Sequence, residues 1–398
     1  MCLARCTNIN YRELWEVTMN RSPRSRSTAS VALTAGALAA LLGFTGCAAE
    51  PPSKPTASPT TAPTADPPAE EGPEPLGPRQ STTGLAAPWS IAYVENSALV
   101  SERDSGKLLE LTADGASREI TTISDVVHGG EGGLLGIAVS PAAEGTQPEY
   151  LYAYSTSGTG NRVQRFPLTG EPGALAIGEP TAILEGLPSA TSHNGGRIAF
   201  GPDGMLYVTV GDASQPWLSQ DLDSLAGKIL RLTPDGGVPD DNPFDGSPVF
   251  TYGHRNPQGI AWAPDGKMYS SEFGQDTWDE LNVITAGSNY GWPEVEGIAG
   301  DSRYVDPVQQ WAPAEASPSG IAITNDTIYI ANLRGQRVRT VPLSDLTASS
   351  DHFVEEYGRI RDVTVAPDGT LWLLSNNTDG RVEPRDGDDR FIDSGLVK

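Results

Sequence analysis

The chain has 398 residues, a formal net charge of −24 at pH 7 and only three cysteines. A surface this acidic argues against nucleic acid or an anionic membrane surface as a partner, because phosphate groups repel it. The cysteines are Cys2, Cys6 and Cys47, so the sequence beyond them excludes disulfides and thiolate chemistry.

The amino end, residues 1–47, is expected to be a signal peptide region, with Met19 as the true start. Arginines precede an apolar run at residues 31–44 that, at about 14 residues, is short for a membrane span. The following Thr45-Gly46-Cys47 resembles a bacterial lipobox, which implies a lipid on the Cys47 sulfur. We therefore expect an exported lipoprotein on the extracellular face of the cell membrane, touching it only through this lipid. A plain secreted protein with a free cysteine is the alternative.

Residues 48–80 are rich in Pro, Thr, Ala and Glu and lack apolar periodicity, so they are predicted to be a disordered tether. Residues 81–398 are predicted to form one domain. In it a short apolar run, a tight turn and a second apolar run recur six times, at intervals of roughly 40 to 60 residues. The first runs contain Ile91, Ile137, Ile198, Ile260, Ile321 and Val363. This period predicts an all-β fold, a six-bladed β-propeller, because a β-sandwich would not explain it.

Each tight turn marks one end of a hairpin, so residues that flank both runs should gather at the other end. Radial repetition places these ends around one mouth of the central channel. In the fourth copy, antiparallel pairing sets Arg255 and Asn256 beside Gly274 and Gln275. Guanidinium, carboxamide and loop carbonyls at one place suit an anionic ligand held together with a hard cation.

In the third copy the same pairing sets His193 opposite Asp212. A carboxylate beside an imidazole fixes its tautomer and raises its basicity, as a general base requires. A structural hydrogen bond that closes the hairpin is the alternative interpretation.

Three more arginines are expected at the mouth: Arg334 after the fifth copy, and Arg359 and Arg361 before the first run of the sixth. With Arg255 they make four in a strongly acidic protein. One arginine usually forms a surface ion pair, whereas four together suggest a ligand with several carboxylates or phosphates. The glycine-rich stretch around Glu131 also begins a blade.

An acidic loop follows the fourth copy. Asp279 and Glu280 with Tyr290 offer oxygen ligands for calcium, and an acidic loop without metal is the alternative.

From about residue 85 to 376 the chain resembles the soluble PQQ-dependent aldose sugar dehydrogenases, the glucose/sorbosone dehydrogenase family of six-bladed propellers. The motifs that carry the resemblance are GEGGLLGIAVSP, HNGGRIAFGPDGMLYVTVGD, LAGKILRLTPDG, PDDNPF, YGHRNPQGIAWAPDG, DELN, GSNYGW, LRGQRV and GRIRDV. Such a set in this order is highly specific for the family.

The resemblance implies roles for individual residues. His193 would be the catalytic base and Asp212 its partner. The carried-over contacts to pyrroloquinoline quinone (PQQ) are Glu131, Arg255, Asn256, Arg334, Arg359 and Arg361. A calcium ion on the PQQ would take the carbonyls of Gly274 and Gln275, and a second would bind at Glu280 and Tyr290. The chain departs from the family at Ser192, Phe273 and Gln275.

The implied activity is PQQ- and calcium-dependent oxidation of aldose sugars at the anomeric carbon to lactones, with electrons passed to an external acceptor that the sequence does not identify. Two alternatives come from other classes. A calcium-dependent lactonase on a propeller would leave the arginine cluster idle. A non-catalytic cell-surface binding propeller would need neither cofactor.

Overall fold

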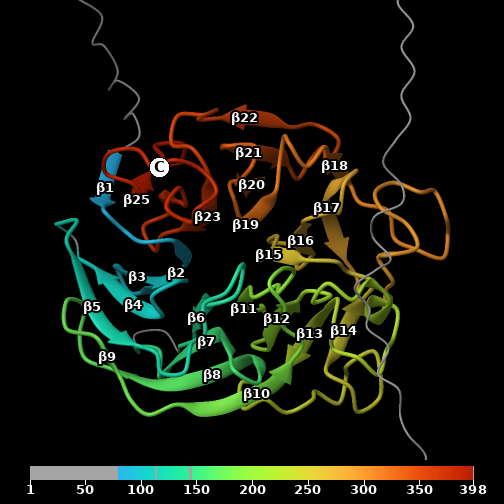
Figure 1. Ribbon diagram of the computed structural model, residues 1–398, viewed down its shortest axis with the longest axis horizontal. Helices are drawn as coiled ribbons and strands as arrows, with labels where there is room; N and C mark the ends of the chain where they lie inside the picture. The colour runs from blue at the N-terminus through green and yellow to red at the C-terminus, as the bar shows by residue number, and fades with distance from the viewer. Residues whose placement is uncertain (1–78, 113, 143–145, 398) are drawn as a thin grey trace, which may run out of the picture. The chain divides into compact units, whose positions relative to one another are not determined.

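The computed structural model describes residues 79–112, 114–142 and 146–397, which form six antiparallel sheets arranged in a ring (Figure 1). The predicted all-β fold and its six blades are confirmed. The described residues contain no α-helix, only a 3₁₀ helix, η1 (Pro216–Ser219). In this part of the chain no helix has the length and apolar character needed to cross a membrane. The predicted signal, lipobox and residues 48–78 of the predicted tether lie outside the described residues.

The first three blades follow one another along the chain. Blade 1 contains β2 (Pro88–Val94), β3 (Ser97–Glu102), β4 (Lys107–Leu111) and β5 (Ser117–Thr122). Blade 2 contains β6 (Leu134–Val139), β7 (Tyr150–Ser157), β8 (Gly160–Thr169) and β10 (Thr181–Leu187), with the short β9 (Ala176–Ile177) beside β8. Blade 3 contains β11 (Ile198–Phe200), β12 (Leu206–Val210), β13 (Lys228–Leu232) and β14 (Val249–Tyr252).

The last three blades complete the ring. Blade 4 contains β15 (Pro257–Trp262), β16 (Met268–Glu272), β17 (Asp279–Ile284) and β18 (Gln309–Trp311). Blade 5 contains β19 (Pro318–Thr324), β20 (Thr327–Asn332), β21 (Arg337–Pro342) and β22 (Ser350–His352). Blade 6 contains β23 (Ile360–Val365), β24 (Leu371–Ser375) and β25 (Arg390–Asp393), and β1 (Arg79–Thr83) pairs with β25 as its fourth strand.

The six predicted first runs are the first strands of the six blades. These strands contact one another around the centre of the ring, where Figure 1 shows β2, β6, β11, β15, β19 and β23. The hairpin register of blade 4 pairs Ile260 with Ser270 and Pro257 with Glu272, as predicted. β1 begins at Arg79, within the last two residues of the predicted tether.

The core is divided among six apolar clusters; five lie between two neighbouring blades, and the cluster between blades 2 and 3 also includes Trp89 of blade 1. Between blades 3 and 4, for example, Ile229 meets Ile260 and Met268. Because both faces of the inner strands are covered, β12 is buried at all five positions, whereas the outermost strand β5 has no buried residue. The rigid inner strands therefore fix the positions of the loops at their ends.

Candidate functional site

His193 lies in the loop before β11, and its imidazole bonds to the carboxylate of Asp212. The distance from His193 Nδ1 to Asp212 Oδ1 is 2.7 Å. Asp212 is fully buried, and its other oxygen accepts a bond from Trp292 Nε1 at 2.9 Å. The backbone of His193 is left-handed, with φ of 61°, a conformation that costs free energy for a residue with a side chain. The structure thus places the two residues side by side, as the hairpin pairing predicts.

The other ring nitrogen of His193 faces Arg255. The guanidinium donates from Nη2 to His193 Nε2 over 2.8 Å, so Nε2 carries a lone pair and the proton sits on Nδ1. Nδ1 then donates to Asp212. A neutral imidazole in this tautomer has its basic nitrogen on the side of Arg255, which is the arrangement that a general base requires.

Arg255 is held by the loop after β16. Its Nη1 donates to the Phe273 carbonyl at 3.0 Å, and both Nε and Nη2 donate to Gln275 Oε1, at 3.0 and 2.6 Å. Burial lowers the pKa of Arg255, although the carboxylates of Asp212 and Glu131 oppose this shift. The Gln275 side chain, a departure from the family pattern, therefore serves to orient Arg255.

Glu131 and Asn256 support the His193 loop. Glu131 Oε2 accepts the backbone N–H of His193 at 2.9 Å and the Asn256 carboxamide at 3.4 Å. Asn256 is fully buried and accepts the backbone N–H of Gly195 at 2.9 Å. Glu131 lines the central cavity, whereas Asn256 does not. Asn256 instead contacts the loop that carries His193.

The central cavity has a volume of about 190 Å³ and is strongly cationic. Its lining includes Arg103, Arg334, Arg359, Arg361 and Arg381. Three of the four predicted arginines therefore meet here, while Arg255 lines an adjoining cavity that shares Phe273 with the first. Phe273, another departure from the family pattern, lies between the arginine cluster and the Arg255 site.

Arg361 is buried, and none of its hydrogen-bond partners among the described residues is a carboxylate. It donates to Gln258 Oε1 at 2.8 Å, to Asn376 Oδ1 at 3.1 Å and to Ser319 Oγ at 3.3 Å, all of them neutral groups. Burial lowers the pKa of Arg361. A buried cation with only neutral partners is costly unless an anion binds to it, so the floor of this cavity favours an anionic ligand.

The other arginines of the cavity are only partly neutralised. Arg359 Nη2 donates to Asp379 at 3.1 Å, yet its buried Nε has no hydrogen-bond partner in the structure. Arg381 shares Asp379, at 3.0 Å, and approaches Glu131 at 3.8 Å. Arg334 is exposed and has no ion pair within the described residues. The cluster therefore retains positive charge that a polyanionic ligand can neutralise.

The predicted calcium ligands lie on the other side of Arg255. Glu272, Glu280 and Glu296 surround a small cavity of about 10 Å³ with Tyr290. Burial, followed by the neighbouring Glu272, raises the pKa of Glu280. The Tyr290 hydroxyl donates to the Val283 carbonyl at 2.7 Å and accepts from the Thr285 N–H at 2.9 Å, so its oxygen is already engaged.

Gly274 and Gln275 offer backbone carbonyls instead. Their N–H groups donate to Asp279 and Glu296, while their carbonyl oxygens accept no hydrogen bond from the described residues. The described part of the chain contains no group of three or more His, Cys, Asp or Glu side chains placed to hold a metal ion. The calcium sites at Gly274 and Gln275 and at Glu280 and Tyr290 stay predictions.

Sequence reasoning missed Arg103, Arg381, Gln258 and Trp292. Arg103 directly follows β3, just as Arg334 follows β20 shortly after its end, so its position at the mouth was a usable signal. Trp292 and Gln258 carried no such signal, because their roles depend on contacts between loops and between blades.

The chain is similar to known proteins in sequence and in fold. The family model described as Glucose / Sorbosone dehydrogenase matches residues 85–383. The PQQ-bound aldose sugar dehydrogenase structure from Streptomyces coelicolor is similar, with a TM-score of 0.75, 46% identity and coverage of 79% of this chain and 96% of that one.

Two curated relatives are also similar to the chain. Aldose sugar dehydrogenase YliI of Escherichia coli is 30% identical over 344 residues, which is 76% of this chain and 91% of the relative. Quinoprotein glucose dehydrogenase B of Acinetobacter calcoaceticus is 34% identical over 243 residues, which is 53% of this chain and 50% of the relative. The chain thus matches about half the length of that last protein.

Proposed function

Because the chain belongs to the glucose/sorbosone dehydrogenase family, we propose that it is a PQQ-dependent oxidoreductase that converts aldose sugars to lactones at the anomeric carbon. The observation that carries the proposal is the cationic cavity beside the hydrogen-bonded pair of His193 and Asp212. Arg361 supplies a buried charge with neutral partners, and His193 presents a basic nitrogen on the adjoining side.

The chain's own residues fit PQQ, which is a tricarboxylate. Arg334, Arg359 and Arg361 would hold its carboxylates, and Arg103 and Arg381 line the same cavity. The unpaired Nε of Arg359 is a buried donor that a ligand carboxylate would satisfy. Bound PQQ supplies the two-electron acceptor for the hydride of the sugar.

His193 would act as general base. Its Nε2 takes the proton of the anomeric hydroxyl while the C1–O single bond becomes the lactone carbonyl. Arg255 now occupies that lone pair, so its guanidinium must turn aside when the sugar binds. Asp212 then stabilises the imidazolium through the Nδ1 hydrogen bond, and Trp292 keeps the carboxylate in place.

We also propose calcium at the carbonyls of Gly274 and Gln275, because hard cations prefer oxygen ligands and these two oxygens accept no hydrogen bond from the part of the chain that the structure describes. A second ion at Glu280 would relieve the repulsion among Glu272, Glu280 and Glu296. Export, a lipid on Cys47 and an external electron acceptor complete the proposal; the lipid rests on the resemblance to a lipobox, and the acceptor on the resemblance to the family.

Reconstitution tests this function. Purified protein is mixed with PQQ and CaCl₂, and reduction of an artificial dye is followed with a panel of aldoses. We expect aldose-dependent dye reduction that is lost on prolonged chelation and restored by calcium. Lactone opening without PQQ would instead indicate a hydrolase. PQQ-independent sugar binding with neither activity would indicate a binding propeller.

His193→Ala provides the catalytic variant for the same assay. We expect turnover to fall by at least about 10²-fold, since positioned general bases typically contribute 10²- to 10⁴-fold. The matched control is His352→Ala in β22, in the outermost strand of blade 5, which should leave turnover unchanged. Full turnover in His193→Ala would remove the base from the mechanism.

A further inference from the structure

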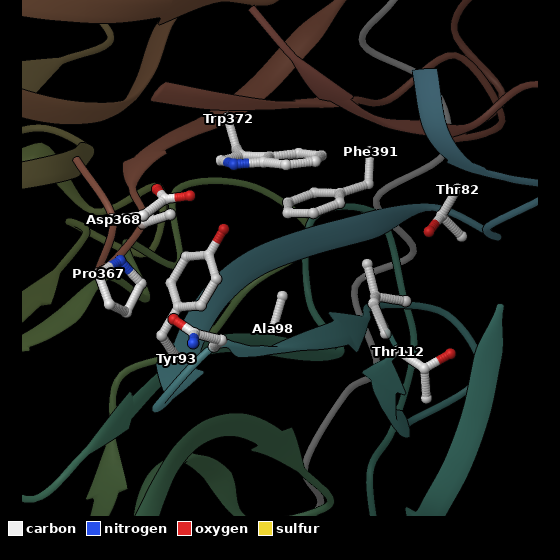
Figure 2. A pocket seen from close by; sticks show the side chains of 11 residues that line it. Thr82, Tyr93, Ala98, Thr112, Pro367, Asp368, Trp372 and Phe391 are labelled. Carbon is white, nitrogen blue, oxygen red and sulfur yellow. The ribbon is translucent and has the colours of Figure 1, made fainter. Parts of the chain in front are cut away.

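A second cavity of about 210 Å³ lies between blade 1 and blade 6, near the tight turns of their hairpins (Figure 2). Asp368 belongs to the turn between β23 and β24, whereas Arg361 and Asn376 lie at the opposite ends of these strands. The cavity is thus at the other end of the blades from the arginine cluster. It takes no part in the proposed oxidation.

Aromatic rings form much of its wall. Trp372 and Phe391 are stacked, with centroids 4.4 Å apart and an interplanar angle of 12°. In Figure 2 these two rings lie along one side of the cavity, and Tyr93 stands across from them with its hydroxyl directed toward Trp372. Ala98 and Leu111 complete an apolar floor. Such a surface packs against the flat apolar face of a ring.

The polar groups of the cavity are only partly satisfied. The Tyr93 hydroxyl is buried and has no hydrogen-bond partner in the structure. Burial, followed by the nearby Asp368 and Asp393, raises the pKa of Tyr93, so this hydroxyl keeps its proton and needs an acceptor. Asp368 binds the Thr370 N–H and hydroxyl through Oδ1 at 3.0 and 2.6 Å. Asp368 is exposed, and its Oδ2 accepts no hydrogen bond from the described residues, so the cavity offers a ligand one donor, the Tyr93 hydroxyl, and one acceptor, the Asp368 carboxylate.

These features select the chemistry of a ligand. It must accept a hydrogen bond from the Tyr93 hydroxyl and donate one to the Asp368 carboxylate, which a hydroxyl group does and an ammonium group does not. It must also present an apolar face to Phe391, Ala98 and Leu111. The volume is below the range of about 300 to 1,000 Å³ that is typical of drug-sized ligands, so a single ring suits it.

We propose that this cavity binds one pyranose ring of a neutral carbohydrate, at a site separate from the oxidising one. The axial hydrogens of the sugar lie on the aromatic and aliphatic floor, and its hydroxyls join Tyr93, Asp368 and the exposed Asn96 at the rim. No bond of the sugar is broken there.

Calorimetric titration of the PQQ- and calcium-loaded protein tests the proposal. The probes are the methyl pyranosides of glucose, galactose and mannose, whose blocked anomeric oxygen prevents oxidation to a lactone. We expect saturable binding of at least one of them. Tyr93→Phe removes one hydrogen bond and should weaken this binding about 2- to 10-fold. Asn96→Trp places a large side chain at the exposed rim and should abolish it.

Tyr269→Phe in β16 is the matched control, because it makes the same change in another blade and should leave binding unaltered. Aldose oxidation by the two cavity variants should equal that of the unaltered protein, which also shows that they fold. A glycoside that enters the oxidising site would add a second binding event that neither variant changes. Absence of saturable binding, or wild-type affinity in both variants, overturns the proposal. Binding without aldose oxidation would leave it intact while rejecting the proposed dehydrogenase.

Discussion

Arg361 differs from Arg359 and Arg197, two other buried arginines near the centre of the ring, in the groups that neutralise it. Arg359 bonds to Asp379 and Arg197 bonds to Asp362, whereas Arg361 has only neutral partners. Burial alone would raise the pKa of Asp379, but Arg359, Arg361 and Arg381 together lower it, so a single carboxylate serves three guanidinium groups. This imbalance is the physical reason to expect an anionic cofactor.

Arg361→Gln should therefore weaken the binding of PQQ without lowering the stability of the PQQ-free protein. Loss of a buried charge partner typically costs 2–5 kcal/mol of binding, so we expect the Kd for PQQ to rise by about 30-fold or more. Thermal unfolding of the PQQ-free variant should occur at an equal or higher temperature, because an uncompensated buried charge has been removed. Absorbance titration and calorimetry measure the two effects.

Arg303→Gln is the control for Arg361→Gln. Arg303 pairs with Asp301 in an exposed loop and should affect neither quantity. Unchanged PQQ affinity in Arg361→Gln would contradict the assignment of this arginine to the cofactor.

Residues of one hairpin were predictable and contacts between blades were not. His193 and Asp212 flank two strands of the same hairpin, so their pairing follows from the turn position. The bond between Arg255 and His193 joins blades 3 and 4, and its existence depends on the packing distance between sheets. For the same reason the sequence does not predict the neutral surroundings of Arg361, because its hydrogen-bond partners come from three blades.

At the scale of elements, η1 ends against a buried lysine. Lys228, the first residue of β13, is fully buried and donates from Nζ to the carbonyls of Leu218, Ser219 and Ala226, at 2.9, 3.1 and 2.6 Å. These carbonyls include orphan acceptors at the end of a helical turn. Burial lowers the pKa of Lys228 from 10.5 to about 8.

This shift predicts a specific dependence of stability on pH. Between pH 8 and 10.5 the unfolded chain keeps a proton on Lys228 that the folded chain has released, so raising the pH favours the folded state. The effect is complete above 10.5 and absent below 8. A shift of this size corresponds to about 3 kcal/mol in total.

Urea denaturation of the protein and of Lys228→Met at pH 7 and pH 10 measures this contribution. The difference between their free energies of unfolding should change by about 2 to 3 kcal/mol in favour of the unaltered protein at the higher pH. Tyrosines that titrate near pH 10 act equally in both proteins and cancel. Lys267→Met, at an exposed lysine, should show no such change. A pH-independent difference would mean that Lys228 stays charged in the folded state.

Inner strands were predictable from sequence because both their faces are buried and their residues are apolar, as in β12 and β20. The outer strands β5, β18 and β22 carry mixed, partly exposed residues without a clear period. These strands form because the preceding strand has a free edge, and the local sequence pattern does not reveal that edge.

At the scale of the molecule, the residue before each blade's central Ile or Val faces the axis of the ring. The six equivalent residues are Ser90, Gly136, Arg197, Gly259, Gly320 and Asp362. A Cβ on any of the three glycines would overlap the next blade, so inner strands approach closely there. The space on the axis is filled by Arg197, which bonds to Asp362 at 2.8 Å and to Ser90 at 3.0 Å.

The number of blades followed from the spacing of the repeats, but the closure of the ring did not. Thr82 and Thr83 of β1 pair with Phe391 and Arg390 of β25, so the first and last described strands complete one sheet. The sequence of β1 is short and polar. It becomes a strand because the last blade offers an unpaired edge.

The Arg197–Asp362 pair joins blades 3 and 6, which lie opposite each other in the ring, so it should support the whole fold. Asp362→Asn leaves a buried guanidinium without its carboxylate, and breaking a buried pair from one side typically costs about 3 to 5 kcal/mol. The double variant Arg197→Met with Asp362→Leu removes both charges and should lose less than Asp362→Asn alone. Guanidinium denaturation measures both.

Lys267→Ala breaks the exposed pair with Asp265 and should change the free energy of unfolding by less than about 1 kcal/mol. If Asp362→Asn were no more costly than this control, the pair on the axis would not be what ties opposite blades together. The ring would then be held by contacts between neighbouring blades, such as the apolar clusters between blades 5 and 6 and between blades 6 and 1. A smaller loss in the double variant would assign the cost to the unpaired charge and not to the missing contact across the axis.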